Sequence, residues 1–296
     1  MKRNRSLLFS FIIILFCIML FKMYHLDIKL FIMKHFTYNI QTNMYKLLDT
    51  IRIININENN IPFELLDKIY IFNSGDIKKL KSSKEKCKKI LDELCNRTNK
   101  LDCRRRNDFV LFDAINSKGG YFPSIHTDIE WNKIKNDGFN VWTLEYNNND
   151  KKIGNMFIFY NKYLQQKYKN TGLFIRYKND KIYIYKSCTQ TSSEYIGLNI
   201  DKYLLETMTK EDFINNTRIY YLDFKEGDTI VFDKNIMHMS DYRDKSNKRK
   251  SFNFRIAIKD KKKNINFINN NNCGYLTSID NNLNSIKNPD MYEYIK

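Results

Sequence analysis

The sequence RIYYLDFKEGDTIVFD, residues 218–233, holds two short apolar runs, RIYYLDF and TIVF, on either side of a Gly-Asp turn. Six more runs of this kind lie between residues 109 and 258: FVLFD (109–113), VWTLEY (141–146), NMFIFY (155–160), GLFIRY (172–177), KIYIYK (181–186) and FNFRIAI (252–258). Several of these runs alternate apolar and polar residues with a period of two, which is typical of strands with one buried face. Eight short strands in one block predict a double-sheet barrel or jelly roll over residues 109–260.

The composition supports one large folded core. The chain of 296 residues is 43% hydrophobic and 15% aromatic, which excludes a disordered tail. Its formal net charge of +17 is of the size that often marks nucleic-acid or membrane-surface binding. The lysines are spread along the sequence, however, and the densest basic runs, 104–106 and 261–263, are short. Since no known nucleic-acid-binding pattern accompanies the charge, we expect a solvated basic surface and no nucleic-acid partner.

The N-terminus has the pattern of a membrane-targeting segment. A basic n-region, residues 1–6, precedes an uninterrupted apolar run at 7–21, and no small-residue cleavage site follows. We therefore predict a signal anchor over residues 7–23. The positive charge of residues 1–6 favours a single-pass type II protein with its remaining chain in a lumen or outside the cell. A cleaved signal peptide, which would give a secreted protein, is the alternative.

Flanking segments complete the predicted organisation, which is mainly β with flanking helices (α+β). Residues 24–108 are expected to be mainly helical, and Ser82 with Glu85 forms a capping-box pattern at the start of one helix. An apolar stripe follows at helical spacing: Cys87, Ile90, Leu91, Leu94 and Cys95. Residues 261–296 are rich in lysine and asparagine, and we expect them to form a loose tail.

Cysteines and sequons say little about chemistry. The chain has six cysteines. With Cys17 in the predicted anchor, those that remain are odd in number and include no CxxC pair, which favours core cysteines, with room for one disulfide, over a metal site. Asn96 and Asn215 each begin a glycosylation sequon. Such sequons also arise by chance in a chain this rich in asparagine.

The chain has only four histidines, so each can be considered separately. His25 and His35 lie in or near the predicted anchor, which leaves His126 and His238 in the strand block. Positions i and i+2 of a strand face the same way, so His126 and Asp128 project together. His238 follows the Gly-Asp turn and its strand. Two imidazoles and one carboxylate can form the facial triad of non-haem iron(II) oxygenases, although two structural core histidines are the alternative interpretation.

An iron site of this kind needs an electron source, and the usual one is 2-oxoglutarate, whose distal carboxylate must meet a cation. Arg249 follows His238 by eleven residues, and its planar guanidinium suits a carboxylate. The hydroxyl of Ser240 can donate to the same group. Arg255 is a second candidate for the cation, and Trp142 is a candidate wall of the cosubstrate pocket.

Together these residues resemble a known family. Its pattern is matched by His126-x-Asp128, the GD-TIVFD approach, His238-x-Ser240 and Arg249-Lys250-Ser251. These segments are similar to the phytanoyl-CoA dioxygenase-like branch of the Fe(II)/2-oxoglutarate-dependent dioxygenases, over about residues 109–260. The resemblance implies a double-stranded β-helix, iron(II) bound by the three triad residues, and 2-oxoglutarate held by the arginine. Two features depart from the family. Thr127 stands where the family often has glutamine. Residues 160–162 differ from the sequence that the family usually has after the strand that follows the His-x-Asp motif.

The resemblance implies a dioxygenase that uses O2 and hydroxylates an unidentified substrate while 2-oxoglutarate is decarboxylated to succinate and CO2. No catalytic side chain beyond the metal ligands is expected. One alternative is a membrane-tethered, non-catalytic binding or structural protein on a degenerate jelly roll. Another is a prolyl or lysyl hydroxylase that acts on secreted proteins.

Overall fold

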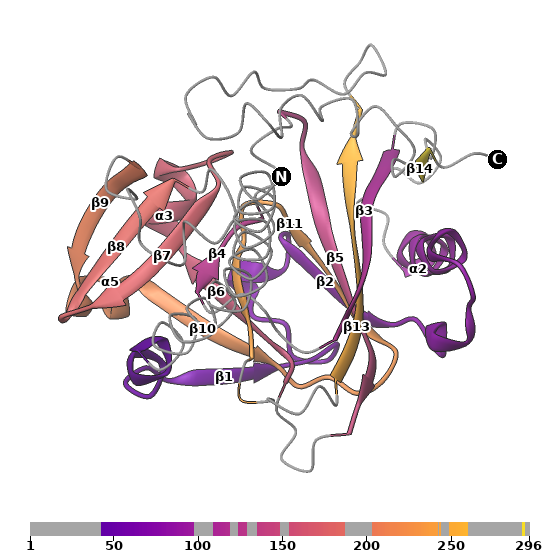
Figure 1. The fold of residues 1–296 in the computed structure, drawn as a ribbon, viewed down its shortest axis with the longest axis horizontal. Helices are drawn as coiled ribbons and strands as arrows, with labels where there is room; N and C mark the ends of the chain where they lie inside the picture. The colour runs from indigo at the N-terminus through magenta and orange to yellow at the C-terminus, as the bar shows by residue number, and fades with distance from the viewer. Residues whose placement is uncertain are drawn as a thin grey trace, which may run out of the picture.

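Two β-sheets packed against each other make up most of the protein in a computed structural model (Figure 1). The described residues are 43–97, 109–118, 124–128, 135–148, 154–186, 203–241, 243, 249–259 and 292–293. The predicted anchor at 7–23, its basic n-region and most of the predicted tail lie outside them. Among the helices in these ranges, none is long and apolar enough to cross a membrane.

The larger sheet has eight strands. In spatial order they are β1 (Ile53–Ile56), β10 (Thr217–Leu222), β6 (Met156–Asn161), β12 (Met237–Ser240), β4 (Ile125–His126), β7 (Leu173–Lys178), β8 (Lys181–Lys186) and β9 (Leu204–Thr209). Every neighbouring pair is antiparallel except β1 and β10, which run parallel at one edge.

The smaller sheet has six strands, all antiparallel to their neighbours. Their spatial order is β14 (Tyr292–Glu293), β3 (Phe109–Lys118), β13 (Arg249–Ile258), β5 (Gly138–Asn147), β11 (Asp228–Asp233) and β2 (Ile69–Asn73).

The chain path between the sheets is that of a jelly-roll-like sandwich. From β3 to β6 successive strands alternate between the two sheets, and from β10 to β13 they alternate again. The hairpin β7–β8 and strand β9 are inserted between these two halves and extend the larger sheet beyond β4. All eight predicted strands are present, and the prediction of a mainly β fold is confirmed.

The segment before residue 109, which was expected to be mainly helical, contains strands as well as helices in its described part. Strands β1 and β2 lie there, and each extends one sheet, alongside a helix at 43–48, the short 3-10 helices η1 (Phe63–Leu65) and η2 (Ile77–Lys79), and α2 (Ser83–Arg97). The β2 sequence, IYIFN, is β-branched and aromatic and stops at the turn after Asn73, so it carries a strand signal. Strand β9 also lies outside the eight predicted runs.

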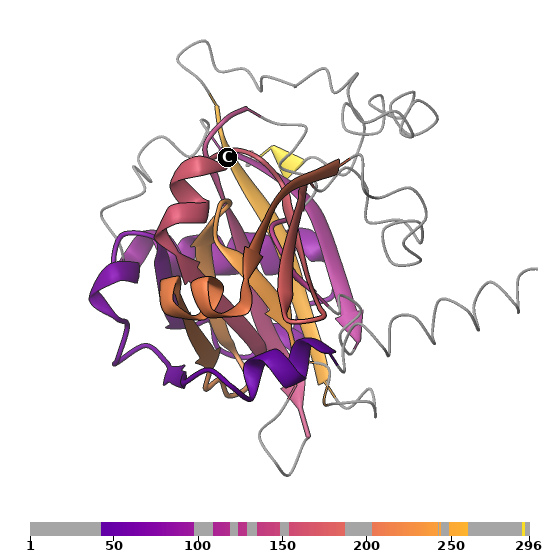
Figure 2. The ribbon, with the colours of Figure 1, turned by 90° about the vertical axis from the view of Figure 1, so that its left-hand side faces the viewer.

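Three apolar clusters define the layers. One fills the space between the sheets and includes Trp142, Ile158, Tyr220 and Phe232. A second covers the outer face of the larger sheet with the helix at 43–48, α3 (Lys162–Lys167) and α5 (Lys210–Asn216), which face the viewer in Figure 2. In the third, α2 packs on the outer face of the smaller sheet. Alternate residues of each strand therefore serve two different layers.

Helix α2 has the predicted start and the predicted apolar stripe. The Ser82 hydroxyl accepts the Glu85 N–H at 3.2 Å, and the Glu85 carboxylate accepts the Ser82 N–H at 3.0 Å, which completes the capping box. Cys87 is a buried free thiol, and burial raises its pKa to about 12. Cys95 is disulfide-bonded. The interpretation as a core cysteine is confirmed for Cys87, and Cys95 is half-buried against the same apolar cluster.

A buried ion pair between Lys86 and Glu145 joins α2 to β5, and the Lys86 ammonium also lies 5.2 Å from the ring centroid of Phe252. We expect Lys86→Met to destabilise the protein by about 3–5 kcal/mol, because it leaves the Glu145 charge buried without its ammonium. The double change Lys86→Met with Glu145→Leu should recover most of that loss. Urea unfolding of both variants measures the difference, and equal losses would contradict this account.

Candidate metal centre

The two histidines of the strand block face each other across one strand pair. His126 in β4 and His238 in β12 are directly opposite in the antiparallel register, and their ring centroids are 4.4 Å apart. The neighbours Met237 and Met239 point into the outer cluster, so His238 points between the sheets. Asp128 follows two residues after His126. All three residues are buried, with 6–7% of their surface exposed.

Thr127, between the two ligand candidates, has a separate structural task. Its hydroxyl accepts the Leu173 N–H at 2.7 Å, and its own N–H donates to the Leu173 carbonyl at 3.0 Å. These bonds continue the pairing of β4 with β7 beyond the two residues of β4. They fix the backbone that carries His126 and Asp128, and they give a reason for threonine at this position.

One atom of each triad residue points to a common point. Oδ1 of Asp128 lies 3.6 Å from Nε2 of His126 and 3.3 Å from Nε2 of His238, and one candidate ligand atom from each residue lies within 4.8 Å of the others. Each Nδ1 lies near a backbone carbonyl two residues earlier in the chain, Ser124 at 3.0 Å and Ile236 at 3.2 Å. A carbonyl only accepts, so Nδ1 carries the hydrogen and Nε2 keeps its lone pair.

Arg255 in β13 holds the other oxygen of Asp128. Its Nη2 and Nε donate to Oδ2 at 2.7 and 3.2 Å. The sequence suggested Arg255 as a second anchor for a cosubstrate, but the structure places its guanidinium on the triad carboxylate. This pairing leaves Oδ1 directed at the imidazoles. Contacts of this kind, from a neighbouring residue to a metal-binding side chain, orient metal ligands in other proteins.

The protonation states also suit a divalent metal ion. Burial acts to raise the pKa of Asp128, but the charge of Arg255 and the two imidazoles outweigh it and hold that pKa well below its ordinary value. Burial and the neighbouring His126 lower the pKa of His238. At neutral pH the pair is therefore a carboxylate and a neutral imidazole, the forms that bind metals. The donor set of two nitrogens and one oxygen fits the facial triad.

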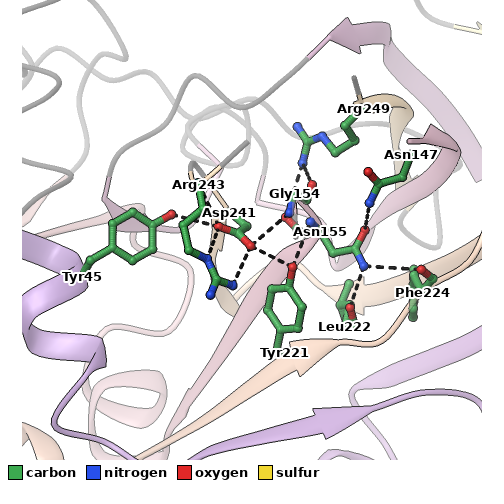
Figure 3. A network of polar contacts seen from close by, with 10 residues as sticks. All are labelled: Tyr45, Asn147, Gly154, Asn155, Tyr221, Leu222, Phe224, Asp241, Arg243 and Arg249. Atoms are coloured by element: carbon green, nitrogen blue, oxygen red, sulfur yellow. Dashed lines mark hydrogen bonds and ion pairs between the residues drawn. The ribbon is translucent and has the colours of Figure 1, made fainter. Parts of the chain in front are cut away.

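Arg249, the first residue suggested for binding the cosubstrate, begins β13 (Figure 3). Arg249 is 2% exposed, and its Nη1 donates to the carbonyls of Gly154 at 2.7 Å and Asn155 at 3.3 Å. Its guanidinium carbon lies 5.7 Å from the ring centroid of Trp142. Ser240 is half-buried in β12, two residues after His238, and therefore on the same face of the sheet. The structure thus brings Arg249 and Trp142 together.

Both predicted glycosylation sites lie on exposed helical residues, Asn96 in α2 and Asn215 in α5. The hydroxyl of Thr217, in the second sequon, is buried and accepts from Asn161 Nδ2 at 2.9 Å. Glycosylation at either asparagine stays a prediction.

No protein-family model and no curated protein matches this sequence. The candidate site is therefore defined by the geometry of the triad and by the pattern of residues in this chain.

We expect the protein to bind one equivalent of Mn²⁺ or Co²⁺ at the triad. A metal concentration one hundred times the Kd should raise the free energy of unfolding by about 2.7 kcal/mol. His238→Ala should abolish both the binding and the stabilisation, since it removes one of three ligands. Ser240→Ala, on the same face of the same strand, is the matched control and should keep both. Calorimetric titration and thermal unfolding measure the two effects, and metal binding that survives His238→Ala would contradict this assignment.

Acid should destabilise the metal-free protein through His238. Its pKa is lower in the folded state than in the unfolded chain, so the unfolded chain binds more protons as the pH falls below about 6.5. Stability should therefore be complete above that pH and decline below it. His238→Gln should show a shallower decline in Tm over the same range. A decline identical to that of the wild type would show that other groups cause it.

Proposed function

We propose that the protein is an iron(II)- and 2-oxoglutarate-dependent dioxygenase that hydroxylates its substrate. The observation that carries this proposal is the convergence of Nε2 of His126, Nε2 of His238 and Oδ1 of Asp128 between two sheets. Further support comes from the strand order, since the alternation of strands between sheets fits a double-stranded β-helix. The resemblance of the sequence motifs to the phytanoyl-CoA dioxygenase-like branch points to the same chemistry.

In this proposal the chain holds and orients the reactants. His126, Asp128 and His238 would bind iron(II), and a facial triad leaves coordination positions open for other ligands. When bound, iron(II) supplies the activation of O2 that couples decarboxylation of 2-oxoglutarate to substrate hydroxylation. Arg255 keeps Oδ2 of Asp128 engaged, so that Oδ1 remains the ligand atom. The apolar cluster between the sheets limits access of water to the site.

Of the two arginines in β13, Arg249 is the better partner for the distal carboxylate of 2-oxoglutarate. Arg255 already donates twice to Asp128, so its guanidinium is engaged by a proposed metal ligand. Arg249 is fully buried beside Trp142, where a charge-assisted bond to a carboxylate is stronger than in water. Ser240 projects from β12 on the same face as His238 and would donate its hydroxyl to the same carboxylate.

We also propose that the domain works in a lumen or outside the cell. The disulfide at Cys95 supports this placement, because disulfides persist in oxidising compartments and are rare in the cytosol. The apolar segment at residues 7–23 would then tether the domain to the membrane.

The test is succinate formation from 2-oxoglutarate by the full-length chain in detergent with iron(II) and O2. Asp128→Ala should reduce turnover by about a hundredfold or more, since it removes a metal ligand. Arg249→Lys should raise the KM for 2-oxoglutarate about tenfold, because lysine lacks the bidentate fork. The matched control is Lys250→Ala, which removes an exposed cation from the next position of the same strand and should change neither value. Metal binding without any decarboxylation would retain the metal centre but reject the dioxygenase.

A further inference from the structure

Gly154 and Asn155 directly precede β6, and their backbone contacts the guanidinium of Arg249 (Figure 3). We call this pair of residues the bracket. Both of their carbonyls accept from Nη1 of Arg249. Gly154 has a φ of +93°, in the left-handed region that glycine adopts without strain. The orientation of the two carbonyls therefore fixes one edge of the guanidinium.

The N–H groups of the same two residues are held by a carboxylate and a phenol. Oδ2 of Asp241 accepts the Gly154 N–H at 3.0 Å. The Tyr221 oxygen accepts the Asn155 N–H at 3.2 Å and donates its own hydrogen to that same Oδ2 at 2.8 Å. Asp241 and Tyr221 thus hold one side of the bracket, and Arg249 contacts its carbonyls.

The Asn155 side chain fixes the bracket to the neighbouring strand end. Its Nδ2 donates to the carbonyls of Leu222 at 2.9 Å and Phe224 at 3.4 Å. These bonds anchor the bracket to β10 and to the residues that follow it. The bracket is therefore held by side-chain contacts as well as by the ladder of β6.

Asp241 is itself held rigidly. It is 1% exposed, and Arg243 donates to both of its oxygens, from Nε to Oδ1 at 2.9 Å and from Nη2 to Oδ2 at 2.7 Å. Burial acts to raise the pKa of Asp241, but the hydrogen bonds and charge of Arg243 and the bond from Gly154 hold that pKa below its ordinary value. Oδ1 also accepts the hydroxyl of Tyr45 at 3.1 Å. The two oxygens thus have different tasks: Oδ2 faces the bracket, and Oδ1 faces the helix at 43–48.

We propose that Asp241 and Tyr221 are positioning residues that set the plane of the Arg249 guanidinium and, through it, the affinity for the distal carboxylate of the cosubstrate. A planar guanidinium makes two parallel bonds to a carboxylate only in one orientation. Asp241 and Tyr221, which hold the bracket, can therefore change the affinity for 2-oxoglutarate without contacting it. This inference rests on the proposed function.

Calorimetric titration of the Mn²⁺-loaded full-length chain tests it with two ligands. 2-Oxoglutarate has a distal carboxylate, whereas oxalate can chelate the same metal but has no group that reaches a remote arginine. Asp241→Asn and Tyr221→Phe should each weaken 2-oxoglutarate binding about tenfold, the usual effect of losing a supporting contact. Oxalate and Mn²⁺ affinities should stay unchanged. Tyr45→Phe is the matched control: it deletes the same kind of hydroxyl from Oδ1 and should leave 2-oxoglutarate binding as in the wild type.

The outcomes separate the positioning role from the proposed function. If the wild type binds oxalate but not 2-oxoglutarate, the cosubstrate assignment falls, and the positioning role falls with it. If the wild type binds both ligands and Tyr221→Phe leaves the 2-oxoglutarate affinity unchanged, the positioning role is overturned and the dioxygenase stands. Parallel losses for oxalate, or an equal loss in Tyr45→Phe, would show general loosening of the fold and also overturn it. Tyr221→Phe, which removes a single oxygen, decides the matter if Asp241→Asn does not fold.

Discussion

The placement of His126 opposite His238 in the ladder between β4 and β12 is the constraint on which the site depends. A slip of one residue would turn one imidazole into the outer apolar cluster, because side chains alternate faces along a strand. Strand β4 is only two residues long, so its register depends on β12 on one side and on β7, with Thr127, on the other. Strand β7 of the insertion thus supports the candidate metal ligands, and β7–β9 together widen the sheet.

A second constraint links the two sheets. Asp128 follows β4 in the larger sheet, and its partner Arg255 lies in β13 of the smaller one. The carboxylate and the guanidinium are each costly to bury alone, and the packing of the sheets brings them together. The triad therefore acquires its final geometry only when the sandwich is closed. Arg249, six positions earlier in the same strand, instead donates to the backbone carbonyls just before β6, so two arginines of one strand have separate partners.

Local sequence patterns predicted much of this fold, and contacts between residues far apart in the sequence determine the rest. Eight of the strands after residue 108 were predictable because they are short apolar runs, several with a period of two, and the triad was predictable because histidines are so scarce. Strand β1 was not, since it has only four residues and lies parallel at an edge, where three of them are exposed. The contact of Arg255 with Asp128 joins residues 127 positions apart, and that of Tyr45 with Asp241 joins residues 196 apart. No local rule specifies such pairs, because the topology of the whole sandwich determines them.

The helix at 43–48 and strands β1 and β2 have a practical consequence for the smallest part of the chain that can fold on its own. Met44, Leu47 and Leu48 pack in one cluster with Phe159 and Ile219, while β1 and β2 cover the edges formed by β10 and β11. A polypeptide cut back to the strand block at residue 109 would expose two unpaired sheet edges and an apolar surface, and edges of that kind invite aggregation. A soluble, autonomous unit therefore has to begin no later than residue 43 and to include the helix, β1 and β2, which the strand pattern after residue 108 does not cover.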